Sequence, residues 1–168
     1  MLDIPVVTVN ENSPYHVSCV EHNSFMFKTQ YGIRYNVGFA KDTILSEDEG
    51  FYHFYILNMD HSHFRHDPLL YETVEAIIWA FFQNENSVML YLCDNIDGRQ
   101  SSRDRLFQYW FDRYPNKKLY TFINKRINYG DICYYGAMIL KKSHPDHDIV
   151  VERFVKYIDD LEDKIRPE

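Results

Sequence analysis

The organisation of this chain is clearest in one stretch, Val88-Met89-Leu90-Tyr91-Leu92-Cys93-Asp94-Asn95-Ile96-Asp97-Gly98-Arg99-Gln100-Ser101. Its first five residues are all apolar and too few for a core helix, so they predict a short buried strand. The polar residues after them predict a turn. Ser101 and Asp104 match the capping box that begins a helix. The stretch therefore predicts a strand, a polar turn and a helix in succession.

The residues before this stretch predict four strands and one helix. The strands are expected at residues 15–21, 24–29, 33–39 and 51–57, where apolar side chains alternate or run continuously. Asp67 as an N-cap and Pro68 at the first helical position predict a helix, with an apolar stripe up to Phe81. Residues 1–14 are expected to form an irregular lead-in.

The residues after the stretch complete the predicted fold. Residues 118–127 alternate and suit an edge strand, residues 132–140 are nearly all apolar and suit a central strand, and a last helix is expected from about His144. The order β-β-β-β-α-β-α-β-β-α predicts an α+β fold in a single domain, residues 1–168. We expect a mixed, largely antiparallel sheet with about three packed helices. This order is similar to the core of the acyl-coenzyme-A-dependent N-acetyltransferases, which implies an acetyltransferase-like sheet.

Composition excludes several classes of protein. The chain has 17% aromatic residues and is expected to be an ordered globule. Three widely spaced cysteines, no signal-like N-terminus and no apolar run of about 20 residues predict a cytoplasmic protein with no membrane contact. The net charge of −7 makes nucleic acid an unexpected partner. A basic segment, 99–142, either supports a narrower interaction or lies beside acidic helices.

The polar turn after residue 92 carries the best candidate site. Arg99 and Arg103 could hold a carboxylate or phosphate beside the backbone amides of a helix N-terminus. The alternative is a structural network in which the neighbouring aspartates pair with these arginines. An unknown protein or a small anionic ligand is the expected partner. The candidate binding residues are Asp94, Asp97, Gly98, Arg99, Gln100, Ser101 and Arg103.

The connection before the first predicted long helix holds a second group of polar residues. His61, His63 and His66 could bind a divalent metal, but their spacing matches no established metal motif, so no metal is expected. Residues 58–68 contain no glycine, whereas the resemblance to acetyltransferases implies a glycine-rich turn there for the cofactor pyrophosphate. No cofactor and no catalytic residue are therefore expected.

Three segments resemble an uncharacterised family of small bacterial proteins, known only as a domain of unknown function. They are Tyr31-Gly32-Ile33-Arg34-Tyr35, the stretch from Cys93-Asp94 to Trp110-Phe111, and Tyr134-Tyr135-Gly136-Ala137 with His144-Pro145. The family has no established activity, so the resemblance implies only a bacterial, cytoplasmic setting. We expect a non-catalytic binding or interaction module. The alternatives are a small-molecule transferase on an acetyltransferase-like scaffold and, third, a metal-dependent enzyme built around the three histidines.

Overall fold

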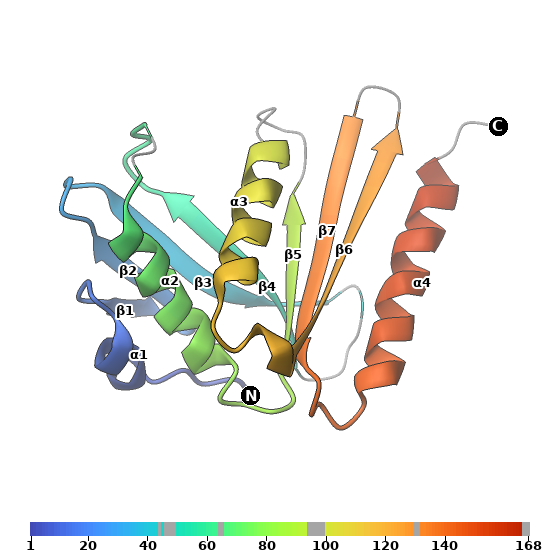
Figure 1. Ribbon diagram of the computed structural model, residues 1–168, viewed down its shortest axis with the longest axis horizontal. Coiled ribbons are helices and arrows are strands. Elements are labelled where there is room, and N and C mark those ends of the chain that lie inside the picture. Colours follow the sequence, from blue (N-terminus) through green and yellow to red (C-terminus); the bar gives the residue numbers. More distant parts are fainter. Residues whose placement is uncertain (44, 46–49, 64–65, 94–99, 130–131, 166–168) are drawn as a thin grey trace.

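A computed structural model describes residues 1–168 apart from 44, 46–49, 64–65, 94–99, 130–131 and 166–168. Within the described residues, the strands form one mixed sheet in the order β1-β2-β3-β4-β5-β7-β6 (Figure 1). The strands are β1 (Ser18–Glu21), β2 (Ser24–Lys28), β3 (Arg34–Lys41), β4 (Phe51–Asn58), β5 (Val88–Cys93), β6 (Tyr120–Tyr129) and β7 (Ile132–Lys141). The helices are α1 (Val6–Asn12), α2 (Pro68–Phe81), α3 (Gln100–Arg113), the 3-10 helix η1 (Lys117–Leu119) and α4 (His147–Ile165). The predicted α+β class is confirmed.

One pair of neighbouring strands is parallel, β4 with β5, and the other neighbours are antiparallel. The crossover through α2 explains the parallel pair, because a helical connection returns the chain in the same direction. This pairing covers only Phe51↔Val88 to His53↔Leu90. Beyond it the two strands diverge, so the sheet forks (Figure 1).

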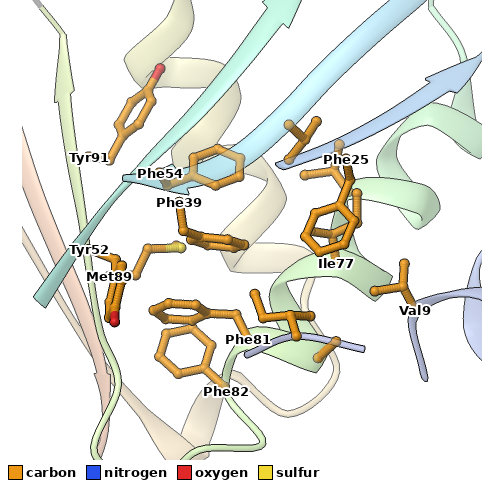
Figure 2. Close-up of a cluster of buried hydrophobic side chains, with 14 of the residues drawn as sticks. Val9, Phe25, Phe39, Tyr52, Phe54, Ile77, Phe81, Phe82, Met89 and Tyr91 are labelled. Carbon is orange, nitrogen blue, oxygen red and sulfur yellow. The ribbon is translucent and has the colours of Figure 1, made fainter. Parts of the chain in front are cut away.

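Helices cover the two faces of the sheet unequally. Side chains from α1, α2 and α3 pack on one face, in a core that includes Val9, Ile77 and Phe107. Side chains from α4 pack on the other face, against β6 and β7, with Phe154 at 1% exposure. Figure 2 shows the first core, where Phe39 of β3 stacks on Phe81 of α2 with ring centroids 4.2 Å apart. Aromatic stacking of this kind adds to the hydrophobic contribution of burial.

The lead-in prediction for residues 1–14 was wrong, because residues 6–12 form α1. Helix propensity does not explain this helix, since its β-branched residues are weak helix formers. Tertiary contacts do: Val9 is fully buried, and the Asn10 side chain bonds both the N–H and the C=O of Val17 at 2.8 Å. The segment is ordered by what it packs against.

The other predicted elements agree with the structure. Asp67 caps α2 by accepting a hydrogen bond from the Leu69 N–H at 3.0 Å, and Pro68 is the first helical residue. Strand β6 lies at the edge of the sheet and β7 lies inside it, as their polarity patterns predict. No helix in the described part of the chain has the length and apolar character needed to cross a membrane.

Candidate functional site

An apolar cleft lies between α2 and α3, above the strands on which both helices pack. The cavity itself has a volume of about 50 Å³, and the space is about 510 Å³ when the open mouth is included. The cleft is therefore a narrow slot. It is lined by Tyr71, Val74, Glu75, Ile78, Phe82, Met89, Phe107, Trp110, Phe111, Tyr114, Tyr120 and Ile139.

Helical spacing explains why these side chains face one another. On α2, Tyr71, Val74 and Ile78 recur every three or four residues and so share one side of the helix. The same spacing puts Phe107 and Trp110 on the facing side of α3. The α3 residues were predicted from the sequence as the packed face of that helix. What the sequence did not predict is that the two faces leave a slot between them.

Glu75 is the one lining residue, among those described, that carries a charge at neutral pH. Burial raises the pKa of its carboxyl, and the charge of Glu72 raises it further, while a hydrogen bond with the Tyr71 hydroxyl lowers it. The ionised form therefore has a free-energy cost at this position. Sequence analysis missed Glu75, although a carboxylate beside an apolar helix stripe was visible as an irregularity.

Three tyrosines add hydroxyl groups to the cleft. The Tyr71 hydroxyl donates to the backbone oxygen of Trp110 at 3.0 Å and so ties α2 to α3. Burial, and next the charge of Glu75, raise the pKa of Tyr71 to about 12. Burial, and next the neighbouring Tyr114, raise the pKa of Tyr120. Both hydroxyls thus stay neutral at physiological pH. An apolar slot with a few polar groups is the usual character of a small-molecule site.

A second, more open hollow shares lining residues with the cleft. It is bordered by α1, α2 and the segment after α3, and its space is about 740 Å³ including open solvent. Glu75 and Tyr114 line both the cleft and the hollow. The remaining lining residues are Asn12, Glu72, Ala76, Trp79, Pro115 and Asn116. The two spaces therefore share a carboxylate and a phenol in their walls.

A histidine–aspartate pair lies on the opposite face of the sheet. His53 Nε2 is 2.6 Å from Asp42 Oδ1, and Asp42, only 1% exposed, also accepts from the Leu45 N–H at 2.7 Å. With the Nε2 proton directed at Asp42, Nδ1 is left as an acceptor. His53 is also the last β4 residue paired with β5, so this imidazole lies where the sheet forks.

The predicted turn site falls outside the described structure. Asp94, Asp97, Gly98 and Arg99 are not among the described residues, and neither are the side chains of Gln100, Ser101 and Arg103. The backbone does show that α3 begins at Gln100, one residue before the predicted capping position. The anion-binding role of this turn stays a prediction.

The predicted histidine group is described at His61, His63 and His66, all of them exposed. The carboxylates that flank them have other contacts. Asp60 pairs with Arg34, 2.6 Å from Nη2, and Asp67 caps α2 while accepting from the Tyr15 hydroxyl at 2.7 Å. Across the described ranges, no three His, Cys, Asp or Glu residues are placed to hold a metal ion.

Comparison with known proteins identifies a family without a known activity. The model of a family of unknown function, DUF6169, matches residues 66–156, just over half of the chain. This confirms the predicted resemblance to a domain of unknown function. No curated protein and no solved structure matches the chain. Every residue that lines the cleft lies within the matched segment, whereas α1 lies outside it.

Proposed function

We propose that this chain, which belongs to the DUF6169 family of unknown function, is a non-catalytic binding module for a slender aromatic compound. The observation that carries the proposal is the narrow apolar cleft between α2 and α3, with aromatic rings from both helices in its walls. Burying a phenyl ring contributes about 1.5–3 kcal/mol, and ring contacts contribute about 0.5–1.5 kcal/mol more. Together these contributions correspond to a Kd between about 1 mM and tens of millimolar for a single-ring compound.

Tryptophan fluorescence tests the proposal because the chain's two tryptophans lie in different spaces. Trp110 lines the cleft and Trp79 lines the hollow, so a Trp79→Phe chain reports on the cleft alone. Phenethyl alcohol is a suitable neutral probe, with excitation at wavelengths where only tryptophan absorbs. We expect a saturable change in Trp110 emission as the probe is added.

A matched pair of substitutions shows whether the probe occupies the cleft. Ile78→Phe adds bulk to the cleft wall and should abolish the change. Ile149→Phe is the same substitution at a side chain of α4 that is 58% exposed. It should leave the change in Trp110 emission intact. The absence of saturable binding, or equal binding to both variants, would reject the proposal.

The second candidate function is small-molecule transfer, and the fork in the sheet favours it. Beyond His53 and Leu90, β4 and β5 no longer pair with each other, so their facing backbone groups can accept an extended, amide-bearing chain. His53, oriented by Asp42, would then be placed to accept a proton at Nδ1. Millimolar acetyl-coenzyme A should raise the Tm if this candidate is right. An unchanged Tm would exclude it in favour of the binding module.

A further inference from the structure

We infer that the compound bound in the cleft carries a positively charged amine, which lies in the adjoining hollow between Glu72, Glu75 and Trp79. This inference rests on the proposed function and names the chemical class of its ligand: an aromatic ring joined by a short chain to an ammonium group. The ring occupies the apolar slot, and the ammonium occupies the acidic hollow.

The side chains that the two spaces share are the first step. Glu75 and Tyr114 belong to the lining of both the cleft and the hollow. A ligand whose ring lies among the aromatic residues of the cleft therefore leaves it past a carboxylate and a phenol. The first polar group that the ligand's chain meets is an acceptor of hydrogen bonds, Glu75.

The chemistry of the hollow is the second step. Its described lining has two carboxylates, two carboxamides and no Lys, Arg or His. Carboxylates only accept hydrogen bonds, so a ligand with N–H groups and a positive charge suits them. The partly buried Trp79 adds an aromatic ring to the same hollow. Aromatic faces attract ammonium groups, whereas they offer little to an anion.

The charge balance of α2 is the third step. Burial raises the pKa of the Glu75 carboxyl, and the charge of Glu72 raises it further. One basic group that acts on the cleft is Arg113, whose charge lowers the Tyr71 pKa. Its guanidinium lies over the Tyr109 ring, 4.1 Å from the centroid. In the described part of the chain no ion pair joins a basic side chain to Glu72 or Glu75, so a ligand ammonium would supply the missing counter-charge.

Three probes of similar size and different charge test the inference: phenethylamine, phenethyl alcohol and phenylacetate. Calorimetric titration of the unaltered chain should give an affinity for the amine about tenfold above that for the alcohol, from charge-assisted hydrogen bonds. Phenylacetate should bind more weakly than the alcohol, because its carboxylate meets two others. The alcohol reports on the ring alone, and so on the proposed function alone.

Conservative substitutions then assign the effect to the two carboxylates. Glu75→Gln and Glu72→Gln should each reduce the amine's advantage over the alcohol, without changing the affinity for the alcohol by more than about twofold. Glu152→Gln, on an exposed residue of α4 at the other face of the sheet, changes the net charge equally and should leave the advantage intact. A Tm measured for each variant identifies any that fails to fold. If either Glu75→Gln or Glu72→Gln fails to fold, the other still tests the inference.

The outcomes separate the inference from the proposed function. Equal affinity for the amine and the alcohol overturns the inference and leaves the binding module standing. The inference is also overturned if both Glu75→Gln and Glu72→Gln still bind phenethylamine more tightly than phenethyl alcohol to the same degree as the unaltered chain. The ammonium group would then be recognised elsewhere. If neither compound binds, the binding module is rejected and the inference falls with it.

Discussion

At the scale of single residues, Glu75 is the side chain whose environment conflicts most with its chemistry. It belongs to a helix stripe otherwise made of Tyr71, Val74 and Ile78, and burial raises the pKa of its carboxyl. A carboxylate kept in such a place lowers the stability of the fold at neutral pH. Under the further inference, the ammonium group of the ligand offsets that cost.

Stability against pH should reveal this cost. Since the pKa of Glu75 is higher in the folded than in the unfolded chain, the folded state holds more protons as the carboxyl titrates. The contribution of Glu75 to stability therefore falls as pH rises from the ordinary carboxyl range through the raised pKa. Glu75→Gln should remove this dependence, and at neutral pH it should raise the free energy of unfolding by up to about 0.5 kcal/mol, a value kept small by partial solvent screening.

Urea denaturation at neutral and at acidic pH measures the effect. The unaltered chain and Glu75→Gln should converge in stability at acidic pH, where the carboxyl is protonated in both states. Glu152→Gln is the matched control and should show no such convergence. A Glu75→Gln chain that is less stable at neutral pH would contradict the explanation.

At the scale of elements, close contact between neighbouring strands depends on a missing side chain. Gly38 of β3 lies opposite Tyr55 of β4, whose ring crosses the position that a side chain at residue 38 would occupy. A Cβ added there would overlap the Tyr55 hydroxyl oxygen and would lie 2.7 Å from the backbone oxygen of Asn23. The Tyr55 hydroxyl also donates to Ser24 Oγ of β2 at 3.0 Å, so three strands meet at this glycine.

Replacing Gly38 should therefore destabilise the fold. Gly38→Ala forces either the Tyr55 ring or the backbone of Asn23 to move, and we expect it to lower the free energy of unfolding by about 2 kcal/mol or more. Gly136→Ala in β7 is the matched control. Its Cβ would meet only the tips of Ile158 and Leu92 at 3.3 Å, and these can shift. Chemical denaturation measures the free energy of unfolding of both variants. Equal decreases for Gly38→Ala and Gly136→Ala would show that the close approach at Gly38 does not cause the destabilisation.

At the scale of the whole molecule, the forked sheet divides the fold into two groups of strands. Beyond the three β4–β5 residue pairs, aromatic side chains connect the groups on the α3 side. Phe107 of α3 stacks on Tyr91 of β5 with centroids 4.4 Å apart, and its ring is 6.0 Å from that of Phe54 of β4. The two groups are thus held together where strand hydrogen bonds are missing (Figure 2 shows Tyr91 and Phe54).

Removing this connection should weaken the molecule as a whole. Phe107→Ala should lower the free energy of unfolding by about 3–5 kcal/mol, the usual cost of deleting a buried phenyl ring. Phe111→Ala is the matched control from the same helix, and because Phe111 is only partly buried it should cost less. Hydrogen exchange should show faster opening of β4 and β5 in the first variant. Equal costs for the two would mean that Phe107 has no special role in joining the groups.

The sequence predicted most elements because their causes are local. Alternating apolar residues in β3, the Asp67 cap of α2 and the continuous apolar run of β7 can each be recognised within a few residues. Helix α1 was missed because its cause is not local: the hydrogen bonds of Asn10 are made with Val17, on the segment that leads into β1. The predicted site residues at 94–103 remain a prediction, since they depend on side chains outside the described part.

By itself, the order of apolar and polar residues determined the strands and the long helices, though not α1, and which face of each is buried, because burial follows the period of the element to which a residue belongs. It could not determine how far β4 and β5 stay paired, nor that α2 and α3 pack with a slot between them. Those features depend on side-chain volumes from segments far apart in the chain, which meet only after folding. The site proposed for this protein belongs to that second group, because Glu75 is partly buried between α2, α3 and the segment after α3, which no local pattern brings together.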